Sequence, residues 1–191
     1  MRANRSCSRM VPGSADVVSI PVGRDGEEHM SEADRAAHIA AESAARGDRE
    51  ALRTVTASVW PMIVRYCRAR VGEQAGTWAI ADDIARRACV SVVGQYEPER
   101  HGTSPFSVHV YRVTARTVAL STRPKGKGLH PGDRMSDFIG DLEPMAREVM
   151  ILRLIAGMSV VDTAAALGMP AGRVRVVQHR ALRECARSGL T

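Results

Sequence analysis

Five polar side chains lie within eight positions near the C-terminus, in the run R-V-R-V-V-Q-H-R of residues 173–180. An arginine can donate two hydrogen bonds to a guanine edge, a glutamine can pair in the same way with adenine, and either can hold a phosphate. In a helix, Val174 and Val177 share an inward face and leave the polar side chains facing out. These candidates for DNA contact are Arg173, Arg175, Gln178, His179 and Arg180. Which of them contacts a base and which a phosphate stays open.

The residues before this run predict the element that must position it. Ser159 and Asp162 have the spacing of a capping box, which starts a first helix. Gly168 supplies the turn to a second helix, Pro170 suits the first turn of that helix, and the small Ala164 permits close packing. The sequence therefore predicts a helix-turn-helix whose second helix contacts DNA. The alternative, two helices of an ordinary bundle with a solvated basic face, is weaker because these positions agree in register.

The composition of the whole chain favours helices and a polyanionic partner. Hydrophobic residues make up 45% of the 191 residues but aromatic residues only 4%, and no alternating runs typical of strands occur. We therefore expect an all-α chain with a core of Ala, Leu and Val. The formal net charge of +6 and the pI of about 9.7 suit a nucleic acid, although a membrane surface would suit them too.

No residue pattern predicts a metal site, a cofactor or an enzyme. The four cysteines have no CxxC spacing, so we expect no zinc site and interpret the thiols as those of a reducing cytoplasm. The sequence contains no glycine-rich phosphate loop, no supported Ser-His-Asp set and no apolar run of membrane-spanning length. The cysteines are Cys7, Cys67, Cys89 and Cys185.

Composition also divides the chain into segments. Residues 1–30, rich in Ser, Gly, Pro and Arg, are expected to be disordered, and Met30 is an alternative start of translation. Residues 31–123 are expected to form one helical domain. The Pro- and Gly-rich segment 124–140 should be a flexible linker to a second domain, residues 141–191. In that domain, a helix that ends at Gly157 is expected to pack beneath the helix-turn-helix.

Periodicity predicts four helices in the first domain. Pro61 should kink or restart the second helix. The third helix carries Asp82, Asp83, Arg86 and Arg87 on one face, where acids and bases pair at i, i+4. These residues form either two exposed ion pairs or a docking surface, and spacing does not choose between them. The helices are expected over about residues 31–46, 49–72, 78–94 and 106–122.

The fourth helix and the loop before it, residues 96–105, offer a second nucleic-acid candidate. Phe106 and Tyr111 lie among basic residues, and rings of this kind stack on single-stranded bases while basic groups bind phosphates. On these residues alone, two core aromatics with a solvated basic face are the favoured interpretation. The expected buried stripe is Val110, Val113 and Thr117, with His109, Arg112, Arg116 and Arg123 outside it.

Two regions of the chain resemble one protein family. The run E-P-M-A-R-E-V-M-I-L-R-L-I-A-G-M-S-V-V-D-T-A-A-A-L-G-M-P-A-G-R-V-R-V-V-Q-H-R-A-L-R looks like the fourth domain of extracytoplasmic-function (ECF) sigma factors of bacterial RNA polymerase. The runs W-P-M-I-V-R-Y-C-R-A-R-V-G and A-D-D-I-A resemble the second domain, nearest the actinobacterial SigD-like group. The match covers residues 47–187. It implies sigma domain 2 and a helix-turn-helix sigma domain 4, joined by the linker.

The resemblance implies a factor that directs promoter-specific transcription initiation. Domain 2 would bind the clamp of the core polymerase and the promoter −10 element, and domain 4 would bind the −35 element. The implied partner is the polymerase core, through the clamp and flap of its large subunits. An anti-sigma factor is a further partner that the resemblance admits. The implied −35 contacts are the five residues of the second helix named above. The implied −10 contacts are Arg100, Phe106, His109, Tyr111, Arg112, Arg116 and Arg123, and the implied core-binding residues are Asp82, Asp83, Arg86 and Arg87.

The sequence also departs from the family pattern. Arg86 and Arg87 stand where the family has Gln-Glu, and His109 stands where it has Trp. Two alternatives therefore stay open: a non-sigma helix-turn-helix regulator of the LuxR type, and a degenerate sigma-like module that binds only proteins. Residues 47–123 look wholly helical and too short for a receiver or ligand-binding domain, which favours the sigma interpretation over the first alternative.

Overall fold

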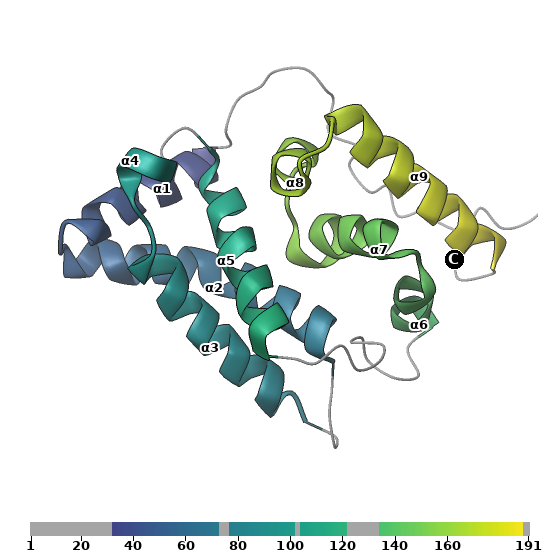
Figure 1. Cartoon of the computed structure of the whole chain (residues 1–191), viewed down its shortest axis with the longest axis horizontal. Helices are drawn as coiled ribbons and strands as arrows, with labels where there is room; N and C mark the ends of the chain where they lie inside the picture. Colours follow the sequence, from purple (N-terminus) through teal and green to yellow (C-terminus); the bar gives the residue numbers. More distant parts are fainter. Residues whose placement is uncertain (1–31, 73–76, 102–103, 122–133, 189–191) are drawn as a thin grey trace, which may run out of the picture.

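The computed structural model describes residues 32–72, 77–101, 104–121 and 134–188. Within these ranges every regular element is a helix, as expected for an all-α chain. Helices α1 to α5 lie together, and α6 to α9 form a second group beside them (Figure 1). The expected N-terminal extension, residues 1–30, lies outside the described residues.

The first two helices begin and end where local signals predict. Helix α1 spans Glu32–Ala45 and is followed by Gly47, whose φ of 95° favours glycine. Asp48 caps α2, Arg49–Val71, because its carboxylate accepts hydrogen bonds from the Glu50 and Ala51 amides at 2.8 and 3.1 Å. Gly72 ends α2 with a φ of 76°, at the end of the predicted range 49–72.

Helix α2 continues through Pro61 as one element. Of the two expectations for Pro61, a restart is therefore wrong, and a kink stays a prediction. Proline has no backbone N–H, so it removes one hydrogen bond from the helix and destabilises it unless tertiary packing compensates. Here Val59 and Ile63, on either side of the proline, are both buried in the core, and this packing holds the helix together.

Helices α3 (Ala79–Gly94) and α5 (Phe106–Ser121) complete the first group, close to their predicted bounds. The expected loop between them contains one helical turn, α4 (Pro98–His101). Its proline stands at the first helical position, where the missing N–H costs nothing. The expectation of a loop over the whole of residues 96–105 is therefore wrong at these four positions.

The second group begins inside the segment expected to be linker, because α6 spans Arg134–Asp141. Helix α7 (Pro144–Met150) follows and continues as a π-helix, η1 (Ile151–Ala156), which ends at Gly157 with a φ of 81°. The remaining expected linker residues, 124–133, lie outside the described residues.

The helix-turn-helix is present. Ser159 caps α8 (Val160–Leu167) by accepting the Asp162 amide at 2.9 Å, and Gly168 makes the turn with a φ of 65°. Pro170 precedes the first residue of α9 (Ala171–Arg187), one position earlier than predicted. Val149, Ala164 and Val174 are buried together between the two helices and α7.

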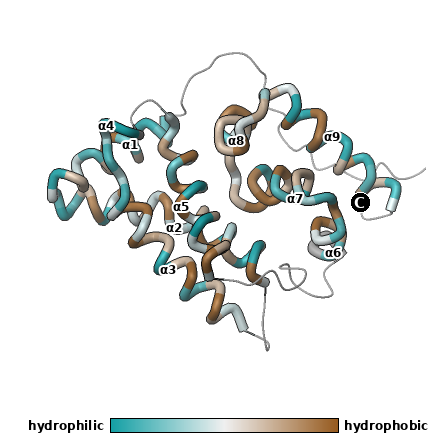
Figure 2. The backbone as a smooth tube through the Cα atoms, in the orientation of Figure 1, coloured by the Kyte–Doolittle hydropathy of each residue, from teal (hydrophilic) through white to brown (hydrophobic). Residues whose placement is uncertain are grey.

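One hydrophobic core extends across both groups. It includes Ile63 and Tyr66 of α2 as well as Ile151 and Leu152 of η1, all nearly inaccessible. Helix α2 packs on η1, and α5 lies beside α8 (Figure 1). Hydrophobic and hydrophilic residues both occur along α2, α3, α5 and α9, as amphipathic helices require (Figure 2). The two groups therefore form one body in this structure.

Candidate nucleic-acid interface

The outer face of α9 is the most basic surface of the helix-turn-helix. Arg173, Arg175, His179 and Arg180 are all exposed on it, as predicted. Val174 is fully buried beneath them, at 0% exposure, so it anchors the start of the helix to α7 and α8. A helix held in this way presents its N-terminal side chains to a DNA groove.

Gln178 is the exception among the predicted contacts, since its expected outward placement is wrong. Its side chain is half-buried, and Oε1 accepts a hydrogen bond from Arg153 Nε of η1 at 3.1 Å. The reason lies in the helical period: Gln178 follows Val174 by four positions and therefore shares its inward face.

Val176 occupies the outer face instead. Its side chain is 57% exposed. The sequence did not mark Val176 as a candidate for DNA contact, because a single valine carries no such signal. Positions two apart on a helix lie about 200° apart, so both Val174 and Gln178 place Val176 on the opposite side. The helical period of about 3.6 residues would have predicted an outward Val176 if Gln178 had been assigned to the inward face.

The aromatic candidates on α5 lie in the core. Phe106 is 2% exposed and His109 is 7% exposed, so neither ring is available for stacking in this arrangement. His109 Nε2 donates to the Val92 carbonyl of α3 at 2.9 Å. The expectation that His109 lies outside the buried stripe is therefore wrong. The stripe runs through Val110, Thr114 and Val118, because α3 covers this side of the helix.

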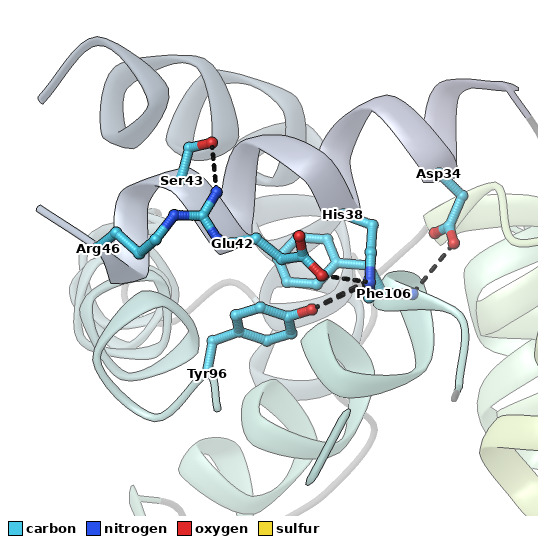
Figure 3. A network of polar contacts seen from close by, with 7 residues as sticks. All are labelled: Asp34, His38, Glu42, Ser43, Arg46, Tyr96 and Phe106. Carbon is cyan, nitrogen blue, oxygen red and sulfur yellow. Dashed lines mark hydrogen bonds and ion pairs between the residues drawn. The ribbon is translucent and has the colours of Figure 1, made fainter. Parts of the chain in front are cut away.

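An acidic cap and a polar network position the start of α5 (Figure 3). The buried Asp34 of α1 accepts hydrogen bonds from the Phe106 and Ser107 amides at 3.0 and 2.9 Å. His38 Nδ1 lies 3.0 Å from the Tyr96 hydroxyl. Burial of Tyr96, aided by the nearby Glu42 and Asp34 carboxylates, raises its pKa to about 12, so the phenol stays protonated.

The remaining basic candidates around α5 are on the surface. Arg100 is exposed in α4 and forms an ion pair with Glu97 at 2.9 Å. Arg116 is exposed and lines a groove between α3 and α5 together with Arg87. The structure thus brings together an arginine expected to contact DNA and one expected to contact protein. Arg123 lies outside the described residues.

Tyr111 and Arg112 face the second group of helices. The Tyr111 hydroxyl donates to Glu148 Oε1 of α7 at 3.0 Å, and Arg112 Nη2 donates to the Ala165 carbonyl of α8 at 3.4 Å. Tyr66 Oη of α2 donates to the same Glu148 oxygen at 2.6 Å, and Arg70 Nη1 lies 3.5 Å from Glu148 Oε2. Burial, followed by the Glu148 charge, raises the pKa of both tyrosines, so both remain donors. No pattern in the sequence pointed to Glu148.

The acidic candidates on α3 differ from each other. Asp83 pairs with Arg87 at 3.2 Å, as predicted. Asp82 instead accepts two hydrogen bonds from Arg68 of α2, at 2.8 and 2.9 Å, so its expected pairing with Arg86 is wrong. These bonds lower the pKa of Asp82. A bidentate arginine from a neighbouring helix competes better for a carboxylate than a long side chain one turn away.

The described residues offer no cluster of three potential metal ligands. Helices long and apolar enough to cross a membrane are likewise absent from this part of the chain.

Known proteins share both the sequence and the fold. Residues 138–187 match the family model for Sigma-70, region 4. The chain is 35% identical over 168 residues to the ECF RNA polymerase sigma factor SigD of Mycobacterium tuberculosis, covering 75% of this chain and 79% of SigD. It is 28% identical over 167 residues to the ECF RNA polymerase sigma factor ShbA of Streptomyces griseus, covering 73% and 87%.

A solved structure of CnrH in complex with the cytosolic domain of CnrY shares the fold, with a TM-score of 0.58 and 22% identity. The match covers 80% of this chain and 96% of the matched chain of that structure. Together with the helix-turn-helix and the extent of the match to SigD, these findings show that the chain belongs to the ECF RNA polymerase sigma factors.

Proposed function

We propose that this sigma factor joins the RNA polymerase core and directs it to promoters by contacting a −10 and a −35 element. The observation that carries the proposal is the basic outer face of α9, with Arg173, Arg175, His179 and Arg180 exposed on an anchored recognition helix. Arginines in this position can hold phosphates and guanine edges. This face is the proposed −35 contact. We place the proposed contact with the polymerase flap on the same group of helices, α6 to α9.

The proposed −10 contact consists of the exposed Arg100, Arg112 and Arg116, with Arg123 beyond the described residues. Phe106 and His109 are buried and Tyr111 is half-buried, so these rings could reach a base only after a rearrangement. The proposed core-binding surface is the face of α3 that carries Asp82, Asp83, Arg86 and Arg87. An exposed ion pair such as Asp83–Arg87 contributes only a few tenths of a kcal/mol, so a desolvated contact with the clamp can replace it.

Simultaneous contact with both elements requires the two helix groups to separate. Elements named −35 and −10 lie roughly 25 base pairs apart, or about 85 Å at about 3.4 Å per pair. A compact body of this size has a radius of gyration of only about 15 Å. The contacts of Glu148 with α2 and α5 must therefore break when the factor engages a promoter.

Run-off transcription tests the proposal. Purified core polymerase with the full chain should yield transcripts from a subset of a genomic promoter library, whereas core alone should not. Arg175→Ala should lower the yield, because Arg175 lies on the proposed −35 contact. Arg53→Ala, at an exposed arginine on α2, is the control and should leave the yield unchanged. Equal yields with and without the chain contradict the proposal.

The buried rings of α5 and the engagement of Asp82 by Arg68 favour a second candidate, a sigma-like module that binds proteins only. An anti-sigma factor is the class of partner we propose for it, since CnrH forms its complex with the cytosolic domain of CnrY. Failure of the full chain to bind core polymerase at micromolar concentration, together with capture of such a partner, selects this candidate.

A further inference from the structure

The inward face of α9 contains one polar side chain. Val174, Ala181 and Cys185 are buried at 0, 3 and 2% exposure, and Gln178 completes their i, i+4, i+7, i+11 spacing. A polar side chain in such a stripe needs a partner, because an unsatisfied amide costs free energy when it leaves water. Arg153 of η1 is that partner.

The chemistry of arginine determines which end of the Gln178 amide is engaged. A guanidinium carries only donors, so the amide atom that faces Arg153 must be the oxygen. The same guanidinium also donates from Nη1 to the Met158 carbonyl, in the turn that leads into α8. Arg153 therefore ties the recognition helix to the start of the helix-turn-helix.

This arrangement removes Gln178 as a reader of adenine. Bidentate recognition of adenine uses the amide oxygen and the amide nitrogen together. The oxygen accepts a hydrogen bond from Arg153, and the half-buried side chain is turned toward the inward face that it shares with Val174. The outer face at the same level of the helix belongs to Val176, which is 57% exposed and flanked in sequence by Arg175.

We propose that Val176 contacts a thymine methyl group in the −35 element, and that Arg153 and Gln178 form a positioning pair that sets the recognition helix. The inference rests on the proposed function. The N-terminal part of a recognition helix contacts base edges, and thymine alone presents a methyl group in the major groove. An exposed valine among arginines matches that group, while the arginines beside it can hold phosphates or guanine edges.

Thymine-to-uracil substitution tests the base contact, since uracil lacks only the methyl group. The −35 sequence is first selected from a randomised library with holoenzyme, and each thymine is then replaced singly. We expect one position at which wild-type affinity falls by a factor on the order of 4. Val176→Ala should abolish this difference, whereas Val161→Ala, at a partly exposed valine of α8, should retain it.

Three outcomes overturn the inference or its basis. If replacing each thymine by uracil leaves the affinity of the wild-type holoenzyme unchanged, the methyl contact is excluded. This outcome requires only wild-type protein, so it stands even if every variant misfolds. Persistence of the uracil effect in Val176→Ala assigns the contact to another residue. A wild-type holoenzyme that selects no upstream sequence instead contradicts the proposed function itself.

A double-mutant cycle tests the positioning pair. Gln178→Leu should weaken binding to all sequences several-fold while the preferred base at every position stays unchanged. Arg153→Met and Gln178→Leu should be non-additive because they remove the same hydrogen bond, whereas Val176→Ala and Gln178→Leu should be additive. A specific loss of adenine preference in Gln178→Leu, or additivity of the first pair, contradicts the assignment.

Discussion

The hydroxyl of Tyr66 donates a hydrogen bond to Glu148 across 82 positions of sequence, with 2.6 Å between Tyr66 Oη and Glu148 Oε1. Tyr66 belongs to α2 and Glu148 to α7, so this bond connects the helix group with the proposed clamp surface to the group with the helix-turn-helix. The Glu148 side chain is only 14% exposed and also contacts Tyr111 and Arg70. One carboxylate thus holds three side chains of the first group.

Replacement of this carboxylate should loosen the joint between the groups. We expect Glu148→Gln to lower the free energy of unfolding by about 1.5–3 kcal/mol, because hydrogen bonds to a charged group are replaced by bonds to a neutral amide. Urea unfolding measures the change. Glu184→Gln, at an exposed position of α9, is the control and should have almost no effect. Equal effects of the two changes contradict the role of Glu148.

The turn at Gly168 should not tolerate a side chain. A Cβ there would meet no atom within 4 Å, so the cost of Gly168→Val arises from the φ of 65° alone. We expect a loss of about 1–3 kcal/mol and weaker DNA binding. Gly172→Ala, at an equally open position inside α9, should instead stabilise the protein slightly. Thermal melting that does not separate the two variants shows that the turn is not under this constraint.

The bond between Arg68 and Asp82 should make stability depend on acid. Its hydrogen bonds lower the pKa of Asp82 in the folded state below the unfolded value of about 3.9. The contribution is therefore present above pH of about 4 and is lost as pH falls through the lower folded value. Asp82→Asn should be less stable than wild type at pH 7, by up to about 1 kcal/mol since the pair is partly exposed, and the gap should close in acid. A gap that is independent of pH contradicts this origin.

Arg175 should contribute directly to DNA affinity. Arg175→Ala is expected to weaken binding to the −35 duplex by about 1–3 kcal/mol, with discrimination lost at one position, if the guanidinium contacts a base. A phosphate contact predicts an even loss across sequences and a salt slope reduced by about one. Titrations at several salt concentrations distinguish the two. An unchanged affinity and an unchanged slope remove Arg175 from the interface.

Charge on α3 should control binding to the core polymerase. Asp83→Arg is expected to weaken binding sharply, since it places a cation where we propose that basic groups of the clamp approach. The double change Arg86→Gln and Arg87→Glu should tighten binding several-fold by freeing Asp83 from its pair with Arg87. Immobilised core polymerase measures both variants. The proposed surface is wrong if Asp83→Arg binds like wild type.

The sequence by itself determined the features that depend on neighbours within about one helical turn. The cap at Ser159, the end at Gly157 and the turn at Gly168 all formed where predicted, because a cap or a positive φ is satisfied locally. The bounds of α3 also lie within one residue of those predicted, since the apolar face of a helix is visible in its own residues.

Tertiary structure decided the features that depend on which helix lies opposite. His109 lies inward because the Val92 carbonyl of α3 accepts a hydrogen bond from its Nε2, and Asp82 pairs with Arg68 of α2 in place of a neighbour on its own helix. Gln178 lies inward because Arg153 meets it there. Neighbours in the sequence do not determine whether a polar side chain is exposed or buried. Burial becomes favourable only where a hydrogen-bond partner is available, and here each partner belongs to another helix.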